Sequence, residues 1–152
     1  MANNRFDVIV VGGGPAGSAA ARTLSAAGVK VCLIDKENFP REKLCGGLLT
    51  MRSKKIYDQV FQTPWESVIE KVSRGVSFHS KDSILRHLRD YKDLFAIQRR
   101  NFDHFLLRLA TESGTELRLG LGVKNVDCKS STVQLSDGTE LSAKIQKMKA
   151  SR

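Results

Sequence analysis

Two apolar runs near the start of the chain predict buried strands. The segments DVIVV (7–11) and VKVCLID (29–35) are rich in valine and almost unbroken by polar residues, which is typical of parallel strands covered on both faces. The segment between them, SAAARTLSAAG (18–28), consists mainly of strong helix formers and ends at a glycine that can cap a helix. The pattern therefore predicts a strand–helix–strand unit.

The second half of the chain contains several shorter strand patterns. The segments TELRLGLGV (115–123) and VDCKSSTVQLSDGTELSA (126–143) predict strands, with a hairpin turn at Ser136-Asp137-Gly138. A strand is also indicated by VSFHS (76–80). The stretch 84–97 is ambiguous, because its apolar positions have helical spacing although a strand interpretation also fits.

Two further helices are predicted from capping signals and apolar spacing. The segment RRNFDHFLLRLA (99–110) places apolar side chains on one face, and Gly114 is expected to stop this helix. Thr63-Pro64-Trp65-Glu66 has the form of a capping box with proline at the first helical position. It predicts a short helix through about Val72, with Trp65 as a packing residue.

Composition narrows the class of protein. The 152 residues, 41% of them hydrophobic, suffice for one globular domain with a core. No apolar run approaches the roughly 20 residues of a membrane span, and the N-terminal segment MANNRF lacks the apolar region of a secretory signal. An odd number of cysteines in unrelated contexts (Cys32, Cys45, Cys128) argues against a disulfide framework and for a cytoplasmic location.

The formal net charge of +9 is compatible with nucleic acid, an anionic membrane or an anionic cofactor. The basic residues are scattered, and neither zinc-finger spacing nor an RNA-recognition signature occurs. We therefore expect a solvated basic surface and no nucleic-acid partner. His79, His87 and His104 have no metal-ligand spacing, so no metal site and no general base are assigned.

The turn between the first strand and the helix carries the clearest chemical signal. Gly12, Gly14 and Gly17 form a G-x-G-x-x-G motif between a predicted strand and a predicted helix, the context that this motif requires. The first glycine permits the tight turn, the second lets a pyrophosphate approach the backbone, and the third allows close helix–strand packing. The helix N-terminus offers unpaired N–H groups and the positive end of its dipole to the phosphates.

An acid at the end of the second strand completes the pattern. Asp35 lies about 20 residues after the motif, where an acid accepts hydrogen bonds from an adenosine ribose and repels a 2′-phosphate. A glycine-rich turn without a ligand remains the alternative, but both flanking elements favour a dinucleotide-binding unit.

Three segments resemble the FAD-binding region of the geranylgeranyl reductase family: DVIVVGGGPAGSAAA (7–21), LIDKENFPREKLCGG (33–47) and RRNFDHFLLRLA (99–110). This family is a branch of the flavoprotein superfamily that includes p-hydroxybenzoate hydroxylase and the flavin-dependent halogenases. Halogenases usually have a Gly-Glu-Ser run where this chain has Cys45-Gly46-Gly47. The resemblance implies an α/β fold, with a Rossmann-like FAD/NAD(P)-binding βαβ unit, a parallel sheet and a β-meander, and it favours strands over 84–97.

The resemblance also implies FAD as the cofactor and a set of residues around it. Arg41 would face the phosphates or the ribityl chain, the Cys45–Gly47 loop would lie close to the isoalloxazine, and Arg99 would lie near the FAD. A cation suits a pyrophosphate, and glycines let the backbone approach a flat ring. Cys45 is open to a redox role or a packing role, and Arg99 to a solvent-exposed position. The full expected set is Gly12, Gly14, Pro15, Ala16, Gly17, Asp35, Lys36, Arg41, Cys45, Gly46, Gly47 and Arg99.

The implied activity is flavin-mediated reduction of a C=C bond in an isoprenoid or related substrate. The expected electron donor is NAD(P)H or another reductant, and the substrate class is lipid-like. We expect residues 1–143 to form a partial FAD-binding domain, with about 73–97 edging into the substrate-domain region and 144–152 forming a disordered basic tail. The second FAD motif of the family is missing, so the domain is expected to be incomplete, with an open sheet edge suited to association. A non-catalytic remnant that at most binds FAD or an adenine nucleotide is the alternative.

Overall fold

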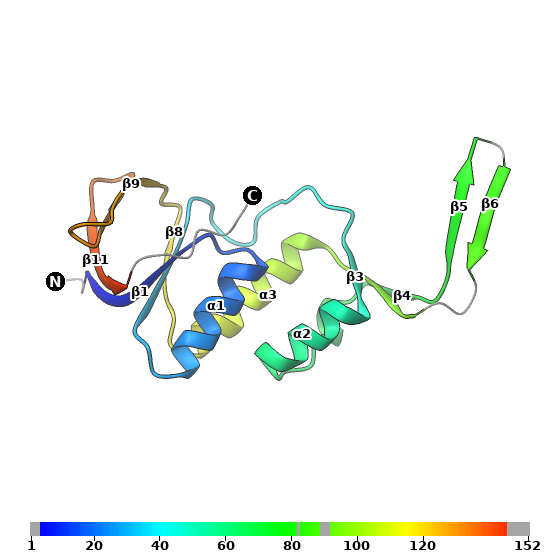
Figure 1. Cartoon of the computed structure of the whole chain (residues 1–152), viewed down its shortest axis with the longest axis horizontal. Coiled ribbons are helices and arrows are strands. Elements are labelled where there is room, and N and C mark those ends of the chain that lie inside the picture. The colour runs from blue at the N-terminus through cyan, green and yellow to red at the C-terminus, as the bar shows by residue number, and fades with distance from the viewer. Residues whose placement is uncertain (1–3, 82, 89–91, 146–152) are drawn as a thin grey trace. The chain divides into compact units, whose positions relative to one another are not determined.

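A computed structural model describes residues 4–81, 83–88 and 92–145. The chain divides into two compact units (Figure 1). The first unit comprises Met1–Glu42 and Asp103–Arg152, and the second comprises Lys43–Phe102. No helix of the described residues is both long and apolar enough to cross a membrane.

The first unit is built on a six-stranded sheet with the order β8-β2-β1-β11-β10-β9. The strands β8, β2, β1 and β11 are parallel, whereas β10 pairs antiparallel with both β11 and β9. Helix α1 connects β1 to β2, and helix α3 precedes β8. The bounds of these elements are β1 (Arg5–Val11), α1 (Pro15–Ala26), β2 (Val31–Asp35), α3 (Arg99–Glu112), β8 (Glu116–Leu119), β9 (Val123–Asp127), β10 (Thr132–Leu135) and β11 (Glu140–Ile145).

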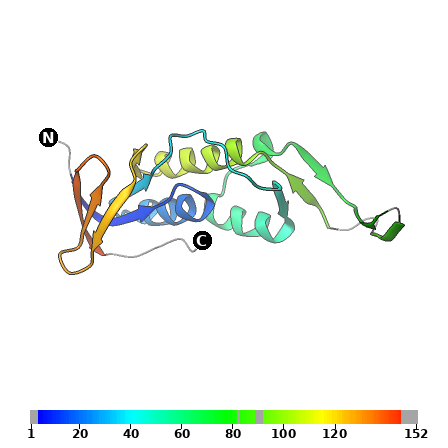
Figure 2. The same cartoon turned by 90° about the horizontal axis from the view of Figure 1, so that it is seen from above.

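Both helices pack on one face of the parallel strands. Their buried side chains, among them Ala21 and Leu107, form one core cluster with Val10 and Leu33 from the two central strands. α1 and α3 run side by side in two perpendicular views (Figure 1, Figure 2). The Arg22 guanidinium of α1 joins them by donating to the Leu109 carbonyl at 3.2 Å.

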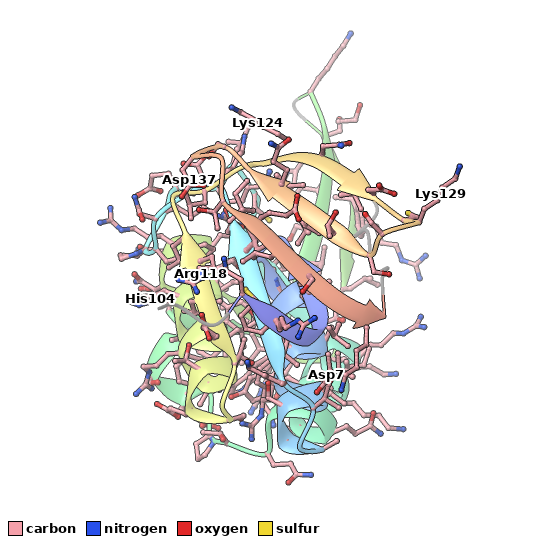
Figure 3. All side chains as sticks on the ribbon, turned by 90° about the vertical axis from the view of Figure 1, so that its left-hand side faces the viewer. Asp7, His104, Arg118, Lys124, Lys129 and Asp137 are labelled. Carbon is pink, nitrogen blue, oxygen red and sulfur yellow. The ribbon has the colours of Figure 1, made fainter. Side chains whose placement is uncertain are left out.

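The β-meander formed by β9, β10 and β11 covers the opposite face. Val133, Leu135 and Leu141 of β10 and β11 pack with Phe6 and Ile34 of the parallel strands in a second core cluster. Figure 3 looks onto this β-meander, with Lys129 at the turn between β9 and β10 and Asp137 at the turn between β10 and β11. The predicted α/β fold with a Rossmann-like βαβ unit, a parallel sheet and a meander is confirmed.

Burial of β2 on both faces has a consequence for the chemistry of Cys32. Its side chain is 0% exposed, and this burial raises the pKa of the Cys32 thiol to about 12, because the thiolate is poorly solvated there. Cys45 and Cys128 are exposed. The thiolate is the reactive form, so Cys32 should be inert in the folded chain.

A maleimide reagent should therefore modify Cys45 and Cys128 in the native chain, and Cys32 only after denaturation. Peptide mass spectrometry at increasing reaction times, with and without urea, measures this directly. Native-state modification of Cys32 as fast as that of Cys128 would contradict the described packing of β2.

The described residues of the second unit form two small sheets, one complete α-helix and the first residues of α3. Its elements are β3 (Leu48–Thr50), α2 (Met51–Phe61), a 3-10 turn (Glu66–Val68), β4 (Lys71–Ser73), β5 (Val76–Ser80), β6 (Ser83–Leu88) and β7 (Leu94–Ala96). One antiparallel sheet has the order β3-β7-β4, and β5 pairs with β6 in a hairpin. The strands predicted over 76–80 and within 84–97 are confirmed.

An aromatic cluster forms the core of this unit. The Trp65 ring is 2% exposed, lies 5.0 Å from the Tyr57 ring and 5.0 Å from the Phe95 ring, and also contacts Phe102. Tyr57 and Phe61 come from the buried face of α2. The predicted packing role of Trp65 is confirmed.

The helix predicted from the Thr63–Glu66 pattern is wrong. Thr63 does not cap a new helix, because its hydroxyl donates to the Phe61 carbonyl at the end of α2 at 2.9 Å. Only a 3-10 turn follows. Glu70 N–H then donates to the Ala96 carbonyl at 2.9 Å, and β4 pairs with β7. Strand pairing outweighs the local capping signal.

The last described strand extends beyond the predicted domain boundary at residue 143. β11 includes Lys144 and Ile145 and pairs with β1 in parallel register, with Ala143 opposite Phe6. The Lys144 ammonium lies 2.8 Å from the Asp7 carboxylate, and its hydrogen bond is the main cause of the lowered pKa of Asp7. The rest of the predicted basic tail, 146–152, lies outside the described residues.

Candidate dinucleotide site

The glycine motif forms the turn between β1 and α1. Gly12 has φ +104, a conformation that side chains disfavour, and its N–H donates to the Ile34 carbonyl of β2 at 2.7 Å. A Cβ atom added at Gly17 would overlap the Gly12 carbonyl oxygen. Helix α1 therefore lies so close to the turn that only glycine fits at position 17.

Asp35 ties this turn to the end of β2. Its Oδ2 accepts from Gly13 N–H at 2.6 Å, and its Oδ1 accepts from Glu37 N–H at 2.9 Å. The residue is 8% exposed. A carboxylate has about four acceptor positions, so both oxygens keep capacity for further donors such as ribose hydroxyls. Lys36, next in the chain, is exposed and lies 3.8 Å from the Glu37 carboxylate.

The start of α1 is open to an anion. Gly14 is the N-cap residue, has an extended backbone, and provides no side-chain cap; Pro15 follows, and the first turn contains no acidic residue. Ala16 is exposed. The first N–H groups of a helix have no partner within the helix and carry the positive end of its dipole. This helix start lacks a competing carboxylate, which suits it to a phosphate.

Arg41 lies beside this helix start. A Cβ atom built on Gly14 would be 3.8 Å from Arg41 Nη2, and the guanidinium stacks on the Phe39 ring, with Cζ 4.8 Å from the ring centroid. Arg41 Nη2 lies 3.3 Å from the Oδ2 atom of Asp103, whose side chain is 0% exposed. Among the described residues Arg41 Nη1 is buried and has no hydrogen-bond partner.

The number of hydrogen-bond donors that Arg41 has left decides whether this place fits the phosphates of a dinucleotide. A guanidinium has five N–H donors, and the Arg41 guanidinium uses only part of this capacity in the chain. The nitrogen that lies nearest to Gly14 is Nη2, which also pairs with Asp103, and the N-terminal end of α1 at this place favours negative charge. The donor set fits an anionic group at this place.

The other predicted residues lie in the second unit. Gly47 has φ +65, and its carbonyl accepts from Ile97 N–H at 2.7 Å. Cys45 is exposed, with its sulfur 3.4 Å from Gly47 N, and a Cβ atom added at Gly46 would meet no described atom within 4 Å. Arg99 is half-buried at the start of α3. That these four residues contribute to the same site stays a prediction.

Two residues of the first-unit site had no predicted role. The Phe39 ring lies against Gly13 and supports Arg41, and Asp103 pairs with Arg41. Asp103 lies within the segment 99–110 that resembles the geranylgeranyl reductase family, but the resemblance implied a role only for Arg99 there. A signal was present, because Asp103 lies between apolar positions of α3 that are themselves buried, such as Phe102 and Leu106, and buried carboxylates are almost always paired.

Metal ligation has no candidate in the described part of the chain, which contains no group of three or more His, Cys, Asp or Glu side chains placed to hold an ion. His79 and His104 are exposed. The His87 side chain lies outside the described residues.

Comparison with curated proteins identifies several relatives. The chain is 30% identical over 137 residues to an uncharacterized protein of Methanosarcina barkeri, covering 90% of this chain and 34% of the relative. It is 32% identical over 155 residues to the menaquinone reductase of Mycolicibacterium smegmatis (90% and 35%). It is 28% identical over 127 residues to the chloroplastic geranylgeranyl diphosphate reductase of Arabidopsis thaliana (82% and 26%).

Solved structures support the fold. A geranylgeranyl bacteriochlorophyll reductase-like protein from Thermoplasma acidophilum matches with a TM-score of 0.80 and 23% identity, covering 93% of this chain and 38% of that one. The halogenase PltM, in a complex with phloroglucinol and FAD, matches with a TM-score of 0.70 and 22% identity (91% and 33%).

The chain spans about a third of the length of the first of these relatives. Residues 7–150 match the family model of FAD dependent oxidoreductases. The predicted cofactor, FAD, is the cofactor of this family, and the predicted resemblance to geranylgeranyl reductases is confirmed by relatives of that name. The chain belongs to the FAD-dependent oxidoreductase family.

Proposed function

We propose that the first unit binds the adenosine diphosphate half of FAD. The observation that carries this proposal is the position of Arg41, whose guanidinium lies with Nη2 beside Gly14 at the uncapped start of α1 and whose Nη1 has no hydrogen-bond partner among the described residues. In this proposal the pyrophosphate is bound by the backbone N–H groups of the helix start and by Arg41, and the ribose hydroxyls donate to Asp35.

The proposed reaction is reduction of a C=C bond in an isoprenoid or related lipid-like substrate. The names of two relatives, geranylgeranyl diphosphate reductase and menaquinone reductase, support this substrate class, because geranylgeranyl diphosphate is an isoprenoid and menaquinone carries an isoprenoid side chain. When bound, the flavin supplies the hydride chemistry. The residues of this chain hold and orient the cofactor, and Cys45–Gly47 and Arg99 are proposed to contact its flavin half. The cytoplasmic location and NAD(P)H as electron donor remain predictions.

The experiment compares thermal protection of the chain by four ligands at equal concentration. FAD, NAD and ADP share the adenosine diphosphate group, whereas FMN has the flavin without it. A ligand that binds only the folded state at 100 times its Kd stabilises it by about 2.7 kcal/mol. We expect FAD to raise the unfolding midpoint most, ADP and NAD to raise it less, and FMN to have little effect.

The ligand series separates the two halves of the proposal. Protection by NAD equal to or greater than that by FAD would indicate a nicotinamide-binding unit and contradict the flavin contacts. Protection by FMN as strong as that by FAD would contradict an adenosine diphosphate site at Gly14 and Arg41.

A further inference from the structure

The Asp103 carboxylate is buried in the first unit and faces Arg41. Asp103 belongs to α3, is 0% exposed, and its Oδ2 lies 3.3 Å from Arg41 Nη2. Removing a buried carboxylate from water is unfavourable unless it is paired. The ion pair with Arg41 compensates for that burial and at the same time fixes one end of the guanidinium.

Arg41 itself comes from a segment with little regular structure. Residues 36–47 connect β2 to β3 without a helix or strand, and the neighbours Glu42, Lys43 and Leu44 are exposed. A long side chain on such a segment has many rotamers to lose on ordering. Two contacts restrict it here: the stack on Phe39 and the ion pair with Asp103.

The geometry of the guanidinium makes the ion pair between Arg41 and Asp103 directional. Because the group is planar and its donors are fixed in a fork, engaging Nη2 with Asp103 also sets where Nη1 and Nε point. The stack on Phe39 sets the plane of the group, and the ion pair sets its rotation within that plane. Together they hold Nη2 beside Gly14 and leave Nη1 without a hydrogen-bond partner among the described residues.

We propose that Asp103 is a positioning residue for the phosphate site: it holds the Arg41 guanidinium beside the start of α1 in the orientation that receives the pyrophosphate. This inference rests on the proposed function. It assigns to α3 a role in cofactor binding through Arg41, without contact between Asp103 and the ligand.

The negative charge of Asp103 and its positioning of Arg41 have opposite effects on phosphate affinity. The direction in which ADP affinity changes when Asp103 is neutralised decides which effect is larger. A negative charge behind Arg41 weakens the attraction of the site for phosphates, so removal of the charge alone would tighten binding. Loss of the pair instead leaves a guanidinium without its counter-ion in a mostly buried place, which favours its movement into water. We infer that the second effect is the larger.

The test is a double-mutant cycle on ADP binding, measured by titration calorimetry with Asp103→Asn, Arg41→Ala and the combined variant. We expect Asp103→Asn to weaken ADP binding about tenfold, as for a lost charged hydrogen bond. In the Arg41→Ala background the same change should have no further effect. Adenosine, which has no phosphate, should bind the wild type and Asp103→Asn equally. Glu112→Gln, which removes an exposed charge of the same helix, is the matched control and should bind ADP as the wild type does.

The other outcomes would contradict either the positioning role of Asp103 or the proposed function. Unchanged or tighter ADP binding by Asp103→Asn, or equal weakening with and without Arg41, would overturn the positioning role. If Asp103→Asn does not fold, Arg41→Lys replaces it, because lysine keeps the charge but lacks the planar fork; wild-type ADP affinity of that variant would overturn the proposal. Failure of the wild-type chain to bind ADP would instead contradict the proposed function itself.

Discussion

The Gly17→Ala variant should unfold at a temperature roughly 6–12 °C below that of the wild-type chain. The added Cβ would overlap the Gly12 carbonyl oxygen, and both atoms belong to backbone segments that are held by the pairing of β1 with β2 and by α1. No rotamer change can relieve this overlap. Overpacking of a core typically costs about 1–3 kcal/mol, and occasionally more. The turn between β1 and α1 must shift to accommodate the added methyl group, so we expect a cost at the upper end of this range.

Gly122→Ala is the matched control for this prediction. Gly122 belongs to the same unit, and its added Cβ would lie 4.0 Å from the Cβ atoms of Lys36 and Ser136, an ordinary contact. Its unfolding midpoint should stay close to that of the wild type. Differential scanning calorimetry of the two variants checks the difference, and equal midpoints would show that the helix does not pack on the turn as closely as described.

The Gly14→Ala variant should keep the fold and bind ADP about 10- to 100-fold more weakly. Gly14 has φ −74 and ψ −178, which alanine adopts without strain. Among the described residues its added Cβ would meet only Arg41 Nη2, at 3.8 Å. The methyl group would occupy the space between the helix start and the guanidinium. A phosphate bound by both would then lose part of its charge-assisted hydrogen bonds.

Stability and affinity must be measured together for this variant. We expect an unfolding midpoint like that of the wild type and a calorimetric Kd for ADP that is at least tenfold higher, while Gly122→Ala changes neither quantity. Wild-type ADP affinity in a folded Gly14→Ala chain would exclude the helix start as the pyrophosphate site.

The first strand–helix–strand unit could be predicted from sequence because its signals are local. The apolar runs, the helix formers and the glycines lie next to one another in the chain, and the structure places β1, α1 and β2 within a few residues of the predicted bounds. Burial of β2 on both faces follows from the same unbroken apolar pattern.

The second unit was harder to predict, since its elements depend on contacts between distant residues. Helix α2 was not predicted, because most of its side chains are polar and its buried face is defined by Tyr57 and Phe61. The Tyr57 ring stacks on both Phe61 and Trp65. The local signal at Thr50, whose hydroxyl accepts from Ser53 N–H at 3.4 Å, is weak by comparison. The capping pattern at Thr63, in contrast, is clear in the sequence, but only a 3-10 turn follows it in the structure.

The candidate site likewise contains residues that local sequence signals predict and residues that only distant contacts bring together. The glycine turn and Asp35 follow from one continuous motif, whereas the pairing of Arg41 with Asp103 joins two segments that are far apart in the chain. Resemblance to a flavoprotein family indicated Arg41, but only the folded arrangement of α3 reveals what holds its guanidinium. Stacking of Arg41 on Phe39 likewise depends on the path of an irregular segment, for which no periodic pattern exists.

The most direct measurement of the central claim is a crystal structure of the chain with ADP bound. We predict the pyrophosphate oxygens within hydrogen-bond distance of the backbone N–H groups of Gly14 and Ala16 and of the Arg41 guanidinium, with the ribose hydroxyls at Asp35. ADP bound elsewhere, or bound at the turn with Arg41 directed away from the phosphates, would contradict the account.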